Sequence, residues 1–288
     1  MKKIAALLMA TLMLALAFTG CAKPAEADTP VTEDVTPELD AAPAVEDSDL
    51  AYIVGNGKMV IGITEYAPMN YYDDAGKLIG FDTEFAEAVC AKLGVTPEFV
   101  VINWDTKEME LEAKNIDCIW NGFTITEERK EALEFTDPYV KNMQVVVIKA
   151  DNAATYVDTA SLSGANLVAE MGSTGESSIA DDENLSQASY VGVSKMADAL
   201  LEVKAGTADA AVIDYVMAKA MVGEGTDFAD LKMVEGLELA TEEYGIAFRK
   251  GSDFTAKVDA AAKELVADGT LTALAEKYGL ALAPAIAG

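Results

Sequence analysis

The chain has 288 residues, with 49 acidic and 21 basic side chains and a formal net charge of −28. This charge argues against binding to nucleic acid and against docking on anionic lipid headgroups, because both surfaces are negatively charged. The sequence contains no histidine, which excludes Ser-His and Cys-His nucleophilic machinery and removes the commonest metal ligand.

The N-terminal segment has the pattern of a bacterial export signal. Residues 1–3 are Met-Lys-Lys, and the apolar stretch 4–17 has the length of a signal-peptide core and is short for a membrane span. The tetrapeptide Phe-Thr-Gly-Cys that ends at Cys21 resembles a lipobox, which implies cleavage before Cys21 and a lipid on its thiol. We therefore predict a lipoprotein signal peptide at 1–20 and anchoring to the outer face of the cell membrane. An ordinary secretory signal with an incidental cysteine is the alternative.

The following segment, 21–50, is predicted to be an acidic, proline-rich tether. It holds four of the chain's eight prolines, and Lys23 is its one basic residue. It offers little aromatic or branched apolar material from which to build a core. As a random coil its ends lie roughly 30 Å apart. The remaining residues, 51–288, suit one large domain or two modest ones.

The first part of the folded region alternates strands and helices. Phe85, Val89 and Leu93 recur at helical spacing, and Gly94 follows them as a helix-ending glycine. Alternation of this kind predicts a sheet with helices on its faces. The expected elements are strands at 59–63, 99–102 and 116–120 and helices at about 81–93 and 105–114.

A second series of strands and helices begins after a long β-rich run at 143–148. Two series joined by two crossings predict an α/β fold with two lobes, a double hinge and a cleft between the lobes. Lobe 1 is expected at 51–142 and 248–288, lobe 2 at 147–243, and the hinge strands at about 143–147 and 243–248. The other expected elements are strands at 166–170, 208–213 and 243–249, helices after 172–175, 194 and 214, and two C-terminal helices.

The loop Asn121–Arg129 carries the functional groups that suit a carboxylate. It follows a predicted strand and supplies a glycine amide at Gly122, a hydroxyl at Thr124 and a guanidinium at Arg129. Arg129 lies in the first turn of a helix that Thr126 can cap, where the helix dipole favours anions rather than cations. The arginine therefore either serves an external anionic partner or pairs with a nearby glutamate on the surface.

Two cysteines follow Cys21, at Cys90 and Cys118. An oxidising compartment permits one disulfide between them. Each cysteine also lies on an apolar face, so two buried thiols are equally consistent with the pattern.

Several motifs in fixed order resemble solute-binding proteins of family 3, the amino-acid-binding components of bacterial ABC importers. The resemblance covers about residues 51–280, and it implies a two-lobed periplasmic-binding-protein fold of type II. The stretch Gly80–Leu93 fits the family signature at every defined position. The matching segments further along the chain are Gly122–Arg129 with its Gly-x-Thr-x-Thr-x-Glu-Arg pattern, Phe135–Tyr139, Ala169–Glu176, Gly206–Asp214 and Tyr244–Gly251.

The resemblance also implies how a ligand backbone is held. Arg129 would bind the ligand α-carboxylate with its guanidinium fork, with further hydrogen bonds from Thr124 and the Gly122 region. Ser173 and Thr174 would offer amides at a helix N-terminus, and Asp214 would take the α-ammonium. Simple helix capping remains the alternative for Ser173, Thr174 and Asp214.

Four more residues are expected near the ligand side chain. Tyr66 and Trp104 match positions where family members stack aromatic rings on the ligand, although either ring can serve packing alone. Glu65 favours a cationic ligand if it faces the cleft. Asn121 adds an amide beside Gly122 and departs from the small residue usual there.

The resemblance implies a binding protein that captures a polar L-amino acid and delivers it to a membrane permease and its ATPase. No cofactor and no catalytic residue are expected, and the chain is expected to be a monomer. One alternative is a periplasmic dehydratase of the same fold, with Glu65, Glu170 or Asp214 as acid or base. Another is a surface adhesin or a partner of a sensor protein.

Overall fold

The computed structural model describes residues 48–287, which belong to one compact unit. The predicted signal peptide, the predicted lipidation site at Cys21 and nearly all of the predicted tether lie outside the described residues. No helix among residues 48–287 is long and apolar enough to cross a membrane.

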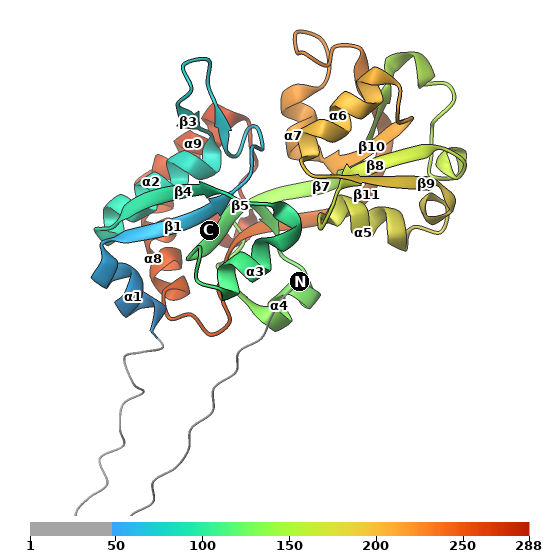
Figure 1. The fold of residues 1–288 in the computed structure, drawn as a ribbon. Helices are drawn as coiled ribbons and strands as arrows, with labels where there is room; N and C mark the ends of the chain where they lie inside the picture. The colour runs from blue at the N-terminus through green and yellow to red at the C-terminus, as the bar shows by residue number, and fades with distance from the viewer. Residues whose placement is uncertain (1–47, 288) are drawn as a thin grey trace, which may run out of the picture. The chain divides into compact units, whose positions relative to one another are not determined.

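One half of the unit, lobe 1, is built on parallel strands. Strand β1 pairs in parallel with β4 on one side and with β5 on the other. Helices α2, α8 and α9 pack against one another on one side of these strands (Figure 1). The elements of lobe 1 are α1 (Asp49–Asn56), β1 (Lys58–Ile63), β2 (Tyr71–Tyr72), β3 (Leu78–Ile79), α2 (Phe81–Leu93), β4 (Thr96–Val101), η2 (Trp104–Thr106), α3 (Lys107–Glu112), β5 (Cys118–Thr124), α4 (Glu127–Ala132), β6 (Leu133–Phe135), α8 (Thr255–Ala267), α9 (Thr270–Tyr278) and α10 (Pro284–Ala287).

The other half, lobe 2, is a sheet that is covered on both faces. Strand β8 pairs in parallel with β9 and with β10. Val168 packs in the same cluster as Leu200 of α6, whereas its neighbour Leu167 packs with Ile179 of α5. Burial of both faces explains why these strands read as continuous apolar runs. The elements of lobe 2 are β8 (Asn166–Glu170), α5 (Thr174–Asp181), β9 (Ser189–Val193), α6 (Met196–Ala205), β10 (Ala210–Asp214) and α7 (Tyr215–Met221), with short 3-10 turns at 150–152, 160–162 and 185–187.

Two long strands join the lobes. They are β7 (Val140–Lys149) and β11 (Leu231–Arg249), which pair antiparallel from Tyr244 opposite Val140 to Leu231 opposite Lys149, with a register shift after Met233. Strand β11 also pairs with β5 and β6, and β7 also pairs with β10. The sheet therefore runs without a break in the order β4-β1-β5-β11-β7-β10-β8-β9, and the expected hinge positions fall inside β7 and β11.

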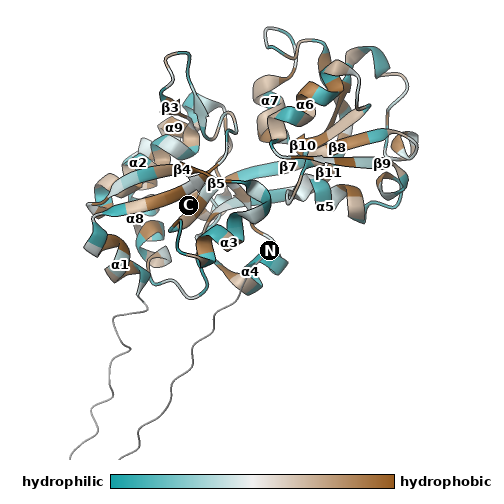
Figure 2. Cartoon of the chain, viewed as in Figure 1, coloured by the Kyte–Doolittle hydropathy of each residue, from teal (hydrophilic) through white to brown (hydrophobic). Residues whose placement is uncertain are grey.

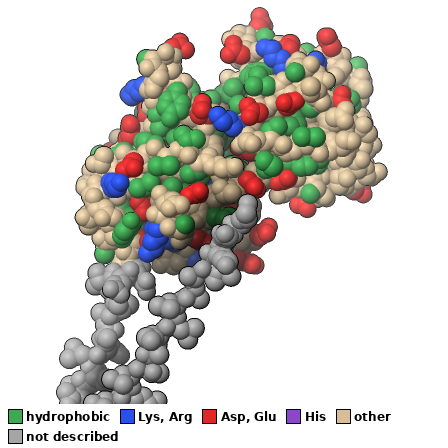
Figure 3. Space-filling view, viewed as in Figure 1, with side chains coloured by type: hydrophobic (Ala, Val, Ile, Leu, Met, Phe, Trp, Pro, Cys, Tyr) green, Lys and Arg blue, Asp and Glu red, His purple; other side chains and the backbone are tan. Residues whose placement is uncertain are grey.

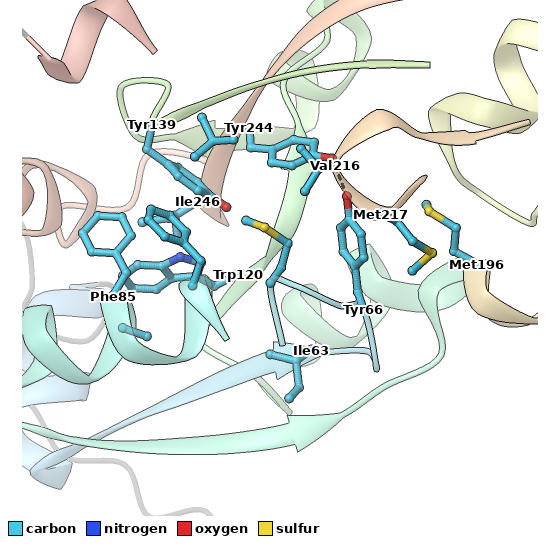
Figure 4. Close-up of a cluster of buried hydrophobic side chains, with 14 of the residues drawn as sticks. Ile63, Tyr66, Phe85, Trp120, Tyr139, Met196, Val216, Met217, Tyr244 and Ile246 are labelled. Carbon is cyan, nitrogen blue, oxygen red and sulfur yellow. Dashed lines mark hydrogen bonds between the residues drawn. The ribbon is translucent and has the colours of Figure 1, made fainter. Parts of the chain in front are cut away.

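Aromatic side chains fill the core of lobe 1 next to the junction. Figure 4 shows Phe85, Trp120 and Tyr139 packed together, with Tyr66 pointing toward Tyr244. The Phe85 and Trp120 rings meet edge to face with centroids 4.9 Å apart, a preferred aromatic geometry. In Figure 2 parts of β1, β8 and β10 are brown, whereas the stretch of β7 between the lobes is teal because it carries Lys141, Asn142 and Gln144. Acidic side chains are spread over both lobes on the face drawn in Figure 3, in keeping with the net charge.

The folded unit begins slightly earlier than the sequence suggested. Ser48 caps α1, and its hydroxyl donates to the carboxylate of Asp253 at 2.6 Å. The guanidinium of Arg249 donates to Asp49 at 2.7 Å, and both side chains are largely buried. The predicted tether, 21–50, therefore overlaps the folded unit at residues 48–50, because Ser48 caps α1 and Asp49 begins it.

Both cysteines in the described part of the chain, Cys90 on α2 and Cys118 on β5, are buried and are free thiols. Burial raises the pKa of Cys90 to about 12, so this thiol stays protonated and unreactive at neutral pH. The sequence left open either a disulfide between Cys90 and Cys118 or two buried thiols, and the structure shows two buried thiols.

Candidate functional site

Residues from both lobes line a small cavity of about 20 Å³ between them, roughly the space of one water molecule. Its walls come from the C-terminal ends of β5, β8 and β10 and from the segments that follow β1, β4, β5, β8 and β9. Ligands of α/β proteins commonly bind at the C-terminal ends of strands. The cavity is lined by Thr64, Tyr66, Trp104, Asn121, Gly122, Thr124, Arg129, Glu170, Ser173, Thr174, Met196 and Asp214.

Arg129 reaches this cavity from the first turn of α4. The hydroxyl of Thr126 accepts from the Arg129 amide and caps the helix, as expected. The guanidinium lies over the ring of Phe123, with its central carbon 4.4 Å from the ring centroid, and donates to the Thr124 carbonyl at 2.8 Å. Among the described residues it has no carboxylate partner within ion-pair distance. The alternative in which Arg129 pairs with a nearby glutamate on the surface is therefore wrong.

A second cation, which the sequence analysis did not identify, lies beside Arg129. Lys107 is buried, and its ammonium donates to the carbonyls of Trp104 and Gly172, each at 3.1 Å. The Trp104 ring centroid is 4.9 Å from this ammonium, within cation–π range. Burial, together with the charge of Arg129, lowers the pKa of Lys107 to about 8. Nothing in the local sequence distinguishes Lys107 from an exposed lysine, because its burial depends on contact with lobe 2.

The carbonyl of Gly172 is the common acceptor on lobe 2. It accepts from Lys107 and also from Arg129, at 3.2 Å. Gly172 immediately precedes α5, where the Ser173 hydroxyl accepts from the Glu176 amide as an N-cap. Ser173 therefore does act as a cap, and it also lines the cavity. Two cations converging on one neutral carbonyl are in position to take a carboxylate instead.

Asp214 is the last residue of β10, and its buried carboxylate lines the cavity from lobe 2. Its carboxylate accepts from the side-chain amides of Asn142, at 2.8 Å, and Gln144. Glu242 of β11 accepts from the same two amides and from the Thr174 hydroxyl. Burial and the charge of Glu242 raise the pKa of Asp214 to about 7. Asp214 occupies the N-cap position of α7, but its side chain makes no capping hydrogen bond.

Comparisons with known proteins identify the family of this chain. A model of the bacterial extracellular solute-binding proteins, family 3, matches residues 59–281. This chain belongs to that family.

Relatives and solved structures agree with the family match. The L-cystine-binding protein TcyJ of Escherichia coli (strain K12) is 30% identical over 224 residues, which is 77% of this chain and 82% of TcyJ. The structure is similar to that of an ancestral arginine-binding protein bound to arginine, with 33% identity and a TM-score of 0.72 over 77% of this chain and 98% of that one. It is also similar to an ancestral amino acid-binding protein described as a precursor of cyclohexadienyl dehydratase, with 32% identity and a TM-score of 0.73 over 80% and 99% of the two chains.

In this family 3 protein Gly122, which lies on the strand before Arg129, packs against the core of lobe 1. The Gly122 amide, expected to face the ligand, donates instead to the buried carboxylate of Asp82 at 2.7 Å. Gly122 has φ +57°, and a β-carbon there would lie 2.6 Å from the ring of Tyr66. The position therefore requires glycine for close approach rather than for its amide.

Asn121 is likewise committed within lobe 1, although it lines the cavity. Its side-chain oxygen accepts from the amide and the hydroxyl of Thr64, and its amide donates to the Thr64 carbonyl and to Asn70. These bonds fix the start of the loop that carries Tyr66. Asn121 was predicted to touch the ligand, and its side chain does line the cavity, but Thr64 and Asn70 occupy both its side-chain oxygen and its amide.

The aromatic residues that were predicted to contact the ligand line the cavity, whereas the predicted acid Glu65 lies on the rim. Tyr66 is buried, with its hydroxyl 2.5 Å from that of Tyr244, and Trp104 lines the cavity with its ring edge to face against Phe123. Glu65 does not line the cavity. It is half exposed and pairs with Lys195 of lobe 2 at 3.3 Å, so it bridges the rims of the two lobes.

Proposed function

We propose that this protein is the extracytoplasmic substrate-binding component of an ABC importer and captures a polar L-amino acid between its two lobes. The observation that carries the proposal is the meeting of Arg129 from lobe 1 and Asp214 from lobe 2 on one buried cavity. An α-amino acid presents a carboxylate and an ammonium within a few ångströms, so it matches this pair of opposite charges.

The capture step follows from the contacts across the cavity. A ligand carboxylate would replace the Gly172 carbonyl as acceptor for Arg129, and an ionised acceptor strengthens that hydrogen bond. A ligand ammonium would stabilise the ionised form of Asp214, whose pKa is raised by burial and by Glu242. Because the two groups come from different lobes, the closed arrangement binds the zwitterion better than an open one, and binding shifts the protein toward closure.

The partners follow from the same role. The closed form would dock on a membrane permease that works with an ATPase, and the chain would act as a monomer. A lipid on Cys21 would keep the folded unit near that permease. The names of relatives support the ligand class, since one binds L-cystine and one solved neighbour holds arginine.

A thermal-shift measurement with the purified chain tests the proposal. The protein is first stripped of copurified ligand by partial unfolding and refolding, and is then screened against the twenty amino acids. A bound ligand raises the melting temperature because it binds only the folded state. Arg129→Ala is expected to abolish the shift, while Lys130→Ala, an exposed neighbour on the same helix, keeps it. A full shift in Arg129→Ala would rule out the carboxylate role.

A dehydratase activity is the second candidate, supported by one observation. Glu170 is buried on the cavity wall, and burial together with Asp214 raises its pKa to about 8, as suits a general acid. The similar ancestral protein described as a precursor of cyclohexadienyl dehydratase points the same way. Turnover assays on cyclohexadienyl acids decide between the two: product formation that Glu170→Gln removes would establish an enzyme.

A further inference from the structure

We infer that Glu170 forms a subsite for a positively charged ligand side chain, so that the captured amino acid carries a second cationic group. The inference deepens the proposed function and rests on it. It assigns a role to a residue that the α-carboxylate and α-ammonium of an amino acid leave unused.

The position of Glu170 supports this role. It is the last residue of β8, it is 4% exposed, and it lines the cavity together with Arg129 and Asp214. One of its carboxyl oxygens, Oε1, has no hydrogen-bond partner in the described part of the chain. A buried carboxyl oxygen without a partner costs free energy, so such groups commonly serve a ligand or a bound water.

The nearest basic side chains already have other partners. The ammonium of Lys107 donates to the Trp104 and Gly172 carbonyls, and it lies beyond ion-pair distance of Glu170, although its charge still lowers the pKa of that carboxyl. The Arg129 guanidinium is held by the carbonyls of Thr124 and Gly172. The ionised form of Glu170 therefore lacks a cation in contact with it.

A cationic ligand group would stabilise the ionised form of Glu170. Burial and the charge of Asp214 raise the pKa of this carboxyl to about 8, whereas the charge of Lys107 lowers it, so near neutral pH the carboxyl is mostly protonated without a ligand. An ammonium or guanidinium in contact with the unpartnered Oε1 would favour the carboxylate, because a nearby opposite charge favours the charged form of an acid.

The remaining walls suit an aliphatic stem between the two ends of such a ligand. Trp104, Met196 and Tyr66 contribute apolar surface to the same cavity, which threonine and serine side chains also line. Arg129 and Asp214 serve the ligand backbone, which leaves Glu170 for the far end of the ligand side chain. Glu65, which the sequence offered as the acid for a cationic ligand, pairs with Lys195 on the rim. Glu170 rather than Glu65 is therefore the acid that would bind a cationic ligand side chain.

A matched pair of ligands tests the inference, since L-arginine and L-citrulline differ chiefly in charge. Isothermal titration of the ligand-stripped protein is expected to give at least tenfold tighter binding of arginine than of citrulline. Glu170→Gln keeps the shape of the side chain and removes its charge, and it is expected to weaken arginine binding by roughly 10- to 100-fold, the value of a charged hydrogen bond. Glu224→Gln, an exposed change of equal charge on lobe 2, is the control and keeps the preference.

The outcomes separate this inference from the function on which it rests. Arginine preference that Glu170→Gln abolishes supports the subsite. Equal or tighter citrulline binding by the unaltered protein, or an arginine preference that survives in Glu170→Gln, overturns the subsite while amino-acid capture stands. Absence of binding by any amino acid overturns the proposed function itself. The ligand comparison on the unaltered protein decides even where Glu170→Gln does not fold.

Discussion

Arg129 of lobe 1 donates to the main-chain carbonyl of Gly172 of lobe 2, at 3.2 Å. Lys107 donates to the same oxygen at 3.1 Å. The two cations therefore hold the lobes together through an acceptor that a ligand carboxylate can replace. Contact between the lobes and capture of a carboxylate depend on the same guanidinium.

Replacement of Lys107 by methionine is expected to loosen the ligand-free protein. Lys107→Met removes one of the two donors to Gly172 while keeping an apolar side chain of similar length against Trp104. Small-angle X-ray scattering should give a larger radius of gyration for the ligand-free variant and an unchanged value once ligand is bound. Identical ligand-free profiles for both proteins would show that Lys107 does not hold the lobes.

Gly122→Ala is expected to destabilise lobe 1 by roughly 1–3 kcal/mol beyond the backbone strain, because an added β-carbon overpacks against rigid rings. The carbon would lie 2.6 Å from Tyr66 and 3.1 Å from Tyr244 at a position with φ +57°. Gly94→Ala is a matched control, since Gly94 has φ +71° and nothing within 4 Å of its β-carbon. Urea unfolding should give a larger loss for Gly122→Ala, and equal losses would contradict the packing argument.

The buried ion pair of Arg249 is expected to contribute more to the free energy of unfolding than an exposed surface pair does. Arg249→Met leaves the carboxylates of Asp49 and Asp117 buried without their cation, at a cost of about 3–5 kcal/mol. Lys58→Met breaks the exposed pair with Glu98 and is expected to cost much less, because water screens an exposed pair. The free energies of unfolding of the two variants measure the difference, which a similar loss in both would refute.

Asp82 is expected to make the stability fall as the pH rises. Burial raises the pKa of this carboxyl from 3.8 to about 7 in the folded protein, so between about pH 4 and pH 7 the folded state binds a proton that the unfolded state has lost. The contribution is fully present below the unfolded pKa and is lost as the pH rises through the folded pKa. Asp82→Asn keeps an oxygen for the Gly122 amide and the Tyr139 hydroxyl and removes the titration.

The measurement for Asp82 is the melting temperature at steps from pH 5 to pH 7.5. Asp82→Asn should flatten the decline seen in the unaltered protein. Asp259→Asn serves as a comparison, because the pKa of Asp259 is raised by burial as well but by less. Parallel curves for the unaltered protein and Asp82→Asn would refute the assignment.

Local patterns in the sequence were enough to predict the elements of the fold. The 3.6-residue repeat of Phe85, Val89 and Leu93 predicted α2, and the apolar runs predicted β1, β5, β8 and β10, because side-chain periodicity follows from local geometry. The motifs predicted Arg129, Asp214, Ser173 and Thr174 as ligand-binding residues, and all four line one cavity. Boundaries were less certain, as the early start at Ser48 shows.

Roles that depend on distant contacts were not readable from the sequence. Nothing near Lys107 in the chain marks it as buried, and nothing near Glu242 places it beside Asp214, because each meets its partner only through the crossing of β7 and β11 between the lobes. The same reason explains why Gly122 and Asn121 were expected to face a ligand. Their polar atoms are taken by Asp82, Asn70 and Thr64, which lie about 40 to 60 residues earlier in the chain.

The sequence by itself determined the family and the alternation of strands and helices, and its motifs predicted Arg129 and Asp214 as the charged residues for a ligand backbone. Only the tertiary structure decided which acid meets which cation. Glu65 and Glu170 are equally plausible acids in the sequence, yet one pairs with Lys195 on the rim and the other is buried in the cavity with an oxygen unpartnered. The energy of a charge depends on its burial and on its nearest partner, and both are set by contacts between segments far apart in the chain.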